Sequence, residues 1–184
     1  MTPDDFAALV RSRRTSMLVD KDRAVTPELV EELCALAQWA PNHKRTWPWR
    51  FALVDGDGRA RLGNVVADAM AAHGDPAEKV AKARGKYLRT PCTLVVGSAS
   101  GDTDNRTAEN RDAVAAGIQN LLLAATAHGL ASYWGSCPYG ATAPVAELCG
   151  FEADTHISAI IYLGWATDTV ASPERPPVTL HHIT

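Results

Sequence analysis

Cysteine is scarce in this sequence, and no motif uses it. The four cysteines, Cys34, Cys92, Cys137 and Cys149, are widely spaced, with no C-x-x-C pair and no histidine at a zinc-like interval. This spacing gives no support to a disulfide framework or a metal site. Cys34 falls on the apolar face of an expected helix and Cys92 opens an apolar strand, so we expect both to act as small buried hydrophobes.

Long hydrophobic runs and an excess of positive charge are also missing. No apolar run approaches the length of a membrane span, and the first five residues are acidic, unlike a signal peptide. The formal net charge of -3 argues against nucleic acid as the main partner, because that would require a broad basic face. We therefore expect one globular domain over residues 1–184, located in the cytoplasm, with no membrane partner.

Familiar catalytic motifs are incomplete. The turn at Asp55–Gly58 lacks the third glycine of a dinucleotide fingerprint, because Arg61 stands there. As a calcium loop it lacks the final glutamate, because Val66 takes that place. Gly135–Pro138 does not form a nucleophile elbow, and there is no P-loop. Hydrolase and nucleotide-triphosphatase functions thus have no support.

Helix and strand signals are present and alternate along the chain, which by itself favours an α/β sheet. Thr2 and Thr26 each precede a proline and an acidic residue, the pattern of a helix start. The expected helices begin at 3 and 27 and cover 59–73, 77–86, 107–128 and 144–149, and the expected strands cover 49–54, 92–98, 131–134 and 156–164. We expect 101–106 to be mobile.

Two segments lie outside that simple alternation. The helix over 107–128 is apolar nearly all round at its centre, which is typical of a core helix or a subunit interface. The tail from Trp165 contains three prolines and cannot be a regular core element. We expect an extended arm, attached through Val178, Leu180 and Ile183.

A basic run, Arg11–Thr15, ends the first expected helix. The arginine side chain presents a fork of donors that suits phosphate oxygens, and Thr15 adds a short donor. The alternative is a solvated basic helix end, which gains about 0.3–1 kcal/mol from the helix dipole. From this run alone, both interpretations remain open.

A loop over residues 40–49 combines a helix stop, an asparagine, His43, two cations and two tryptophans. Loops between rigid elements commonly carry binding groups, and tryptophan beside cations suits a flat, partly anionic ligand. The alternative is that Trp47 and Trp49 are core anchors and His43 is simply exposed. For the two tryptophans we favour the core position.

Taken together, these segments resemble the nitroreductase family of FMN-dependent oxidoreductases. The family typically ends its first helix with Arg-Arg-Ser and follows its second with an Ala-Pro motif and Gln-Pro-Trp. The A-P-x-H-K form found here resembles the compact branch of the family. The segments that carry the resemblance are Arg13–Thr15, Ala40–Lys44, Trp47–Trp49, Ala116–Leu122, Gly129–Trp134 and Ile161–Gly164.

The resemblance implies an α+β fold with a central mixed or antiparallel sheet, flanked by helices, and a homodimer with the long helix and FMN at its interface. The residues it assigns to the cofactor are Arg13, Arg14, Thr15, Trp39, His43, Trp134, Gly135, Ser136 and Arg175. The first three would hold the phosphate and ribityl chain, and Arg175 would also reach the phosphate. Trp134–Ser136 would line the flavin, and His43 would come from the other subunit with Trp39 near it.

Three positions depart from the family pattern. Thr15 replaces the usual serine and keeps the hydroxyl, whereas Trp47 replaces a glutamine and removes an amide that could bond the flavin edge. Arg175 stands alone where a Lys/Arg pair is common.

The implied function is an NAD(P)H oxidoreductase in which FMN carries the chemistry. NAD(P)H would give hydride to the flavin and leave, and a nitroarene, quinone or similar electron-poor acceptor would then bind in its place. One alternative is a flavin-binding carrier or regulator with little turnover. Another is a basic binding module formed by residues 11–14 and 79–89. The second basic cluster also has two interpretations, a solvated helix face or a flap that steers NAD(P)H phosphates.

Overall fold

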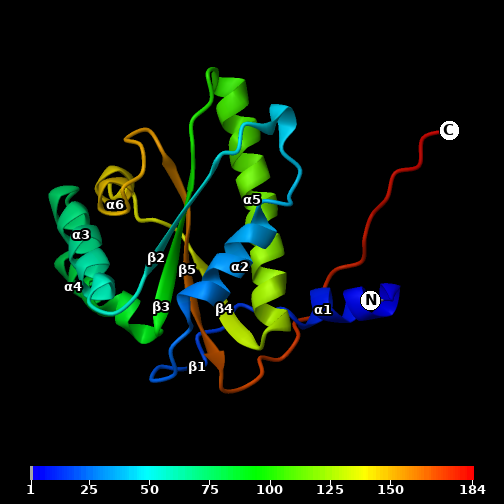
Figure 1. The fold of residues 1–184 in the computed structure, drawn as a ribbon, viewed down its shortest axis with the longest axis horizontal. Coiled ribbons are helices and arrows are strands. Elements are labelled where there is room, and N and C mark those ends of the chain that lie inside the picture. Colours follow the sequence, from blue (N-terminus) through cyan, green and yellow to red (C-terminus); the bar gives the residue numbers. More distant parts are fainter. Residues whose placement is uncertain (1) are drawn as a thin grey trace.

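One five-stranded sheet with helices on both faces organises the chain (Figure 1). The computed structural model describes residues 2–184. In chain order the elements, with short 3₁₀ helices marked η, are α1 (Pro3–Ser12), β1 (Val19–Asp20), α2 (Pro27–Ala37), η1 (His43–Arg45), β2 (Trp49–Val54), α3 (Gly58–Ala72), α4 (Ala77–Gly85), η2 (Lys86–Arg89), β3 (Cys92–Ser98), α5 (Asp104–Ala127), β4 (Leu130–Gly135), α6 (Thr142–Leu148) and β5 (His156–Ala166).

The sheet is antiparallel at every pairing of its named strands. β5 lies between β3 and β4, β2 pairs with β3, and β1 pairs with the last two residues of β5. This confirms the α+β class, whereas the parallel sheet that simple alternation favours is wrong. Two successive helices, α3 and α4, separate β2 from β3, and the single helix between β4 and β5 is short. Neither of these two connections is a crossover that returns the chain to the same edge of the sheet, so β2 and β3, and likewise β4 and β5, run antiparallel.

Each face of the sheet has its own hydrophobic core. Leu94 of β3 and Ile161 of β5 pack with α2 and α5, whereas Val95 and Ile160 pack with α3, α4 and α6. The register between β3 and β5 shifts at Val96/Gly97, which leaves an extra residue in β5. This β-bulge changes which residues of β5 face each core without interrupting the strand.

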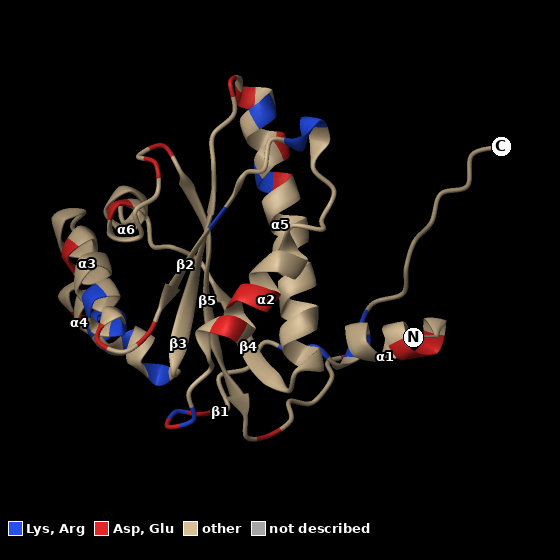
Figure 2. Cartoon of the chain, in the orientation of Figure 1, with Lys and Arg blue, Asp and Glu red and all other residues tan. Residues whose placement is uncertain are grey.

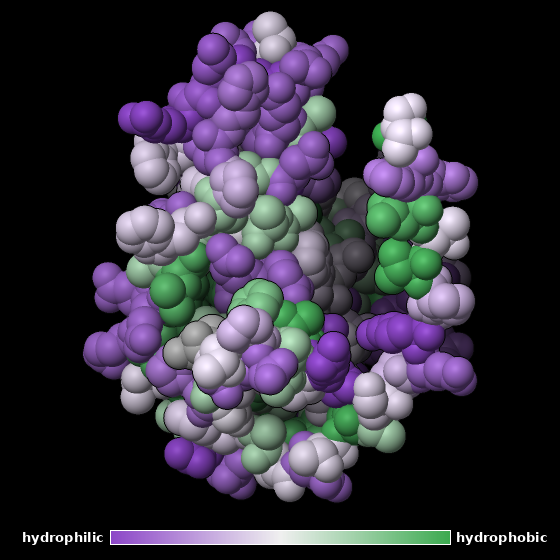
Figure 3. Space-filling model, turned by 90° about the vertical axis from the view of Figure 1, so that its right-hand side faces the viewer, coloured by the Kyte–Doolittle hydropathy of each residue, from purple (hydrophilic) through white to green (hydrophobic). Residues whose placement is uncertain are grey.

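α1 and the C-terminal arm project from the same side of the molecule (Figure 1). α1 begins with a capping box between Thr2 and Asp5 but has no buried residue, and Phe6 is 52% exposed. Residues 167–184 form no helix or strand, in agreement with the expected arm. Its expected attachment points do not meet the rest of the chain, because Val178 and Ile183 are each 92% exposed. Figure 3 shows this side, with apolar residues along the arm.

The long helix differs from its expected form in two respects. α5 begins at Asp104, with the Thr103 side chain accepting a hydrogen bond from the Arg106 N–H, so residues 104–106 belong to the helix and not to a loop. Its buried residues lie on one face, so its apolar centre is only half covered. No helix of residues 2–184 is both long and apolar enough to cross a membrane.

A glycine allows α5 to approach α2 and β2 closely. A Cβ at Gly117 would lie 2.5 Å from the Trp49 indole nitrogen and 2.7 Å from the Ala37 carbonyl oxygen. Trp49 is 4% exposed, as its predicted core position requires. The absence of a side chain at 117 thus sets the spacing between α2, α5 and the sheet.

We expect Gly117→Ala to lower the free energy of unfolding by about 1–3 kcal/mol, because the added methyl group overpacks this contact. Gly85→Ala is the matched control, since a Cβ there meets nothing within 4 Å, and it should change stability by less than about 0.5 kcal/mol. Urea denaturation of both variants measures the difference. Equal midpoints for the two variants would contradict the packing argument.

Candidate functional site

Four arginines surround one pocket where α1 ends. The pocket has a volume of about 370 Å³ and lies between the end of α1, α5 and the start of the C-terminal arm. Its lining residues are Val10, Arg11, Arg13, Arg14, Gln119, Ser172 and Arg175. Three predicted phosphate contacts, Arg13, Arg14 and Arg175, thus come together, and no carboxylate lines the pocket.

Two of the lining residues correct or extend the sequence interpretation. Arg11, which the family resemblance does not assign to the cofactor, lines the same pocket as Arg13. Gln119 was not assigned a role, although it lies inside the Ala116–Leu122 segment that resembles the family. Its position could have been inferred only by knowing that α1 ends beside the middle of α5.

Arg14 carries a donor that has no partner. Its NH1 donates to the Arg13 carbonyl oxygen at 2.7 Å, but its Nε is buried and makes no hydrogen bond. An unpaired buried donor costs free energy, and a phosphate oxygen is a suitable acceptor for it. The donor set, which is cationic and without competing acids, therefore fits a phosphate monoester such as that of FMN.

Backbone pairing ties this pocket to β4. Thr15 forms an isolated parallel bridge with Ser132, and the Ser16 N–H donates to the Ser132 carbonyl oxygen at 2.9 Å. Thr15 itself is exposed, so its hydroxyl is accessible. The pairing holds the end of the basic run beside Ser132 of β4. Ser132 precedes Trp134, the first residue of the predicted flavin lining, by two residues.

The end of β4 presents an exposed indole and a bare backbone. The Trp134 Nε1 donates to the Ser158 carbonyl oxygen at 3.2 Å, which fixes a ring that is 39% exposed. A Cβ at Gly135 would lie 3.2 Å from the Ile160 carbonyl oxygen, so glycine is needed for packing against β5. Ser136 is exposed. These three residues form an accessible edge on which a flat ring can rest.

Trp39 and His43 lie elsewhere in the chain. Trp39 follows α2 and is 84% exposed, and the His43 Nδ1 lies 3.0 Å from the Glu109 Oε1 near the start of α5. The helical rise separates Arg106 from Gln119 by about 20 Å along α5. Within one chain the structure therefore keeps His43 away from the arginine pocket. Trp39 does not line the pocket either, although α2 ends beside the middle of α5, where the Asn120 Nδ2 donates to the Leu36 carbonyl oxygen at 3.5 Å.

The loop that carries His43 is held in an unusual backbone conformation. Lys44, Arg45 and Trp47 have φ values of 61°, 52° and 50°, in the left-handed region that non-glycine residues rarely adopt. Trp47 is 57% exposed, so its expected core position is wrong. Such strain persists only where surrounding contacts hold it, and it is frequent at ligand sites.

A chain of polar contacts holds this loop. The Asn42 side chain donates to the Thr46 Oγ1 at 3.0 Å and accepts from the Trp47 N–H at 2.9 Å. The Thr46 hydroxyl donates to the Oδ1 of Asn110, a buried residue of α5 whose Nδ2 bonds the Ala99 carbonyl oxygen. The loop is thus fixed to the long helix before any ligand arrives.

His43 also belongs to a charged cluster. Glu109 pairs with both His43 and Arg106. The Arg106 NH1 donates to the Glu109 Oε2 at 2.8 Å and also lies 3.2 Å from the His43 Nδ1. The hydrogen bond with His43 lowers the pKa of the Glu109 carboxyl, and Arg106 acts in the same direction. With Nδ1 directed at this carboxylate, the Nε2 of the exposed imidazole is left for another partner.

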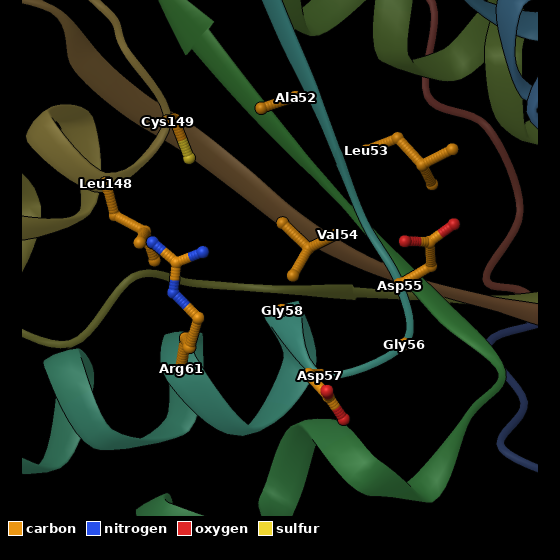
Figure 4. Close-up of a pocket in the computed structure, with 10 residues that line it drawn as sticks. All are labelled: Ala52, Leu53, Val54, Asp55, Gly56, Asp57, Gly58, Arg61, Leu148 and Cys149. Atoms are coloured by element: carbon orange, nitrogen blue, oxygen red, sulfur yellow. The ribbon is translucent and has the colours of Figure 1, made fainter.

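A second cavity, of about 460 Å³, contains none of the predicted site residues. It lies between the β2–α3 turn and α6, with Arg61 reaching toward Leu148 and the Cys149 sulfur pointing inward (Figure 4). Burial raises the pKa of the Cys149 thiol to about 11, so it is protonated at neutral pH. The same cause raises the pKa of Cys137 to about 11 and that of Cys34 and Cys92 to about 12. None is therefore an activated nucleophile.

Comparison with known proteins identifies the family and agrees with the fold. Residues 10–165 match the sequence model of the Nitroreductase family. The Escherichia coli protein named "Putative NAD(P)H nitroreductase YdjA" is 27% identical over 180 residues, which cover 95% of this chain and 97% of that protein. The chain thus has a curated relative along nearly its whole length.

Solved structures share the architecture. The nitroreductase-like family protein from Bacillus cereus superposes with a TM-score of 0.82 at 28% identity, covering 96% of this chain and 94% of that one. The FMN-dependent nitroreductase NfnB from Mycobacterium smegmatis, solved in complex with NADPH, superposes with a TM-score of 0.72 at 22% identity, covering 94% and 95%. The chain belongs to the nitroreductase family.

We expect Asn110→Ala to lower the free energy of unfolding by about 1–3 kcal/mol, because it leaves Thr46 and the Ala99 carbonyl without their partner. Asn105→Ala is the control. It removes only a longer, exposed contact to Glu109 and should cost less than about 0.5 kcal/mol. Urea denaturation tests both variants. An unchanged midpoint for Asn110→Ala would show that this hydrogen-bond network does not stabilise the loop.

Proposed function

We propose that this chain is an FMN-dependent NAD(P)H oxidoreductase. The observation that carries the proposal is the arginine pocket, which is lined by four arginines and no acidic residue, and beside which the buried Arg14 Nε lacks a partner. The names of the similar proteins, an NAD(P)H nitroreductase and an FMN-dependent enzyme complexed with NADPH, support it.

We further propose that the active unit is a homodimer. Apolar side chains of α1 and of the C-terminal arm lack cover in their own chain, and Trp39 is almost fully exposed. In a dimer with the flavin at the interface, Trp39 and His43 of one protomer supply contacts at the flavin that is held by its partner's arginine pocket. This accounts for the distance of His43 from the arginine pocket of its own chain.

Each site residue then has a physical role. Arg13, Arg14 and Arg175 bind the phosphate, and the Thr15 hydroxyl donates to the adjoining chain of the cofactor. Trp134–Ser136 orient the ring and cover one edge of it. The Nε2 of His43 offers a hydrogen bond at the ring.

FMN, when bound, supplies two-electron transfer from NAD(P)H to an acceptor. The protein itself needs no nucleophile, consistent with its four protonated cysteines. Because Trp47 and Trp134 present exposed flat rings, the acceptors we propose are planar and electron-poor, such as nitroaromatics and quinones.

A flavin-binding carrier with little turnover is the second candidate. The observation that favours it is the same exposure of Trp47 and Trp134, which could cover the ring and exclude an acceptor. The experiment is steady-state oxidation of NADPH and NADH by the purified yellow protein with a soluble quinone. Turnover dependent on both substrates supports the enzyme, and flavin-loaded protein without turnover supports the carrier.

We expect Arg13→Ala/Arg14→Ala to lose FMN. Hydrogen bonds to a charged group are worth about 1.5–3 kcal/mol, so each loss should weaken binding at least about tenfold. The flavin-to-protein absorbance ratio after gel filtration measures retention. Lys21→Ala/Arg111→Ala removes the same charge from exposed positions outside the pocket and should retain FMN. Equal retention in the two variants would refute the phosphate assignment.

A further inference from the structure

A second basic cavity lies where the sequence left the role of residues 79–89 open. Its volume is about 500 Å³, and it lies between α4, η2 and the loop after β4. The lining residues are Met70, Lys79, Lys82, Ala83, Gly85, Lys86, Arg89 and Pro138. Four of the eight are cations and none is acidic, in a chain whose formal net charge is -3. Figure 2 shows the basic residues gathered along α4.

The cations of this cavity differ from their neighbour on the same helix. Arg84 turns away toward α3, where it donates to Asp68 at 2.7 Å and to Asn64 at 3.3 Å. Of the four lining cations, only Lys82 has an acidic partner among residues 2–184, and that pair with Glu78 is exposed on both sides. An exposed pair of this kind neutralises little.

Two of the lining cations, Lys86 and Arg89, lie close together. The Arg89 Nε donates to the Lys86 carbonyl oxygen at 3.0 Å, which fixes the guanidinium beside the lysine. Burial, and then the charge of Arg89, lower the pKa of Lys86. Both effects penalise the lysine charge, and a bound anion would offset them. Together with the absence of acidic residues from the lining, this makes the pair suited to an anionic ligand.

The floor of the cavity is apolar. Met70, Ala83 and Pro138 supply it, so the cavity combines a hydrophobic surface with a cationic rim. This combination suits a heteroaromatic base that carries a phosphate. Pro138 stands two residues after Ser136, so the cavity adjoins the loop proposed to line the flavin.

We propose that this cavity binds the adenosine end of NADPH, with the 2′-phosphate held by Lys79, Lys82, Lys86 and Arg89. A phosphomonoester carries a charge of about −1.5 to −2 and three acceptor oxygens, so several cations can reach it from different sides. NADH lacks this group, and the cavity is therefore a selectivity site for the phosphorylated dinucleotide. The inference deepens the proposed function and rests on it for its place beside the flavin.

The first test needs no turnover. Calorimetric titration of the purified protein with 2′,5′-adenosine bisphosphate and with 5′-AMP compares ligands that differ in the 2′-phosphate. We expect at least tenfold tighter binding of the bisphosphate, and loss of that preference in Lys79→Ala/Lys82→Ala. Lys21→Ala/Arg111→Ala, matched in charge and outside the cavity, should keep it. Equal Kd values for the two ligands, or a preference unaffected by the lysine variant, would overturn the proposal.

The second test uses the flavin-loaded enzyme. The ratio of kcat/KM for NADPH to that for NADH should fall at least tenfold in Lys79→Ala/Lys82→Ala and stay constant in the control variant. An equal fall for both dinucleotides would refute a 2′-phosphate site, and so would an unchanged ratio. Flavin-loaded protein that binds the bisphosphate but turns over neither dinucleotide would refute the oxidoreductase instead, leaving the adenosine site in place.

Discussion

The antiparallel pairing of β5 with β3 on one side and β4 on the other is the constraint on which the other parts depend. It gives the sheet two buried faces, because alternating side chains of β3 and β5 pack into the two cores. It also fixes β4, whose far end carries Trp134 and whose middle holds the chain just after the basic run. The strand β4 thus determines the positions of both the arginine pocket and the exposed Trp134 indole.

Charge is distributed unevenly over this framework. The chain has more acids than bases, yet two cavities are lined by cations with no acid among their lining residues. A ligand with several phosphates meets overall repulsion at a distance and local attraction at two places. The acidic loop at β2–α3 lines a third cavity together with Arg61, so opposite charges meet there. The separation of the signs, not the total charge, makes the two basic cavities candidates for anions.

Much of the fold follows from local sequence. The strands at 49–54 and 92–98 match their expected ends, and the proline-led helix starts stand where Thr2 and Thr26 indicate. What the sequence could not supply depends on contacts between distant segments. β1 is two residues long and exists only through pairing with β5. The outward position of Trp47 depends on Asn110, more than sixty residues away, and the cavity at α4 needs Pro138 from the loop after β4.

The uncovered α1 and C-terminal arm have a consequence for how the protein behaves on dilution. Their apolar side chains stabilise the folded protein only when another surface covers them. The stability that comes from this burial therefore depends on the concentration of the covering partner. Arg175 stands in the same arm and lines the arginine pocket. Where the covering surface is a second copy, ligand occupancy and protein concentration become linked quantities. A dilute preparation would then release its cofactor even though every residue that binds it remains intact.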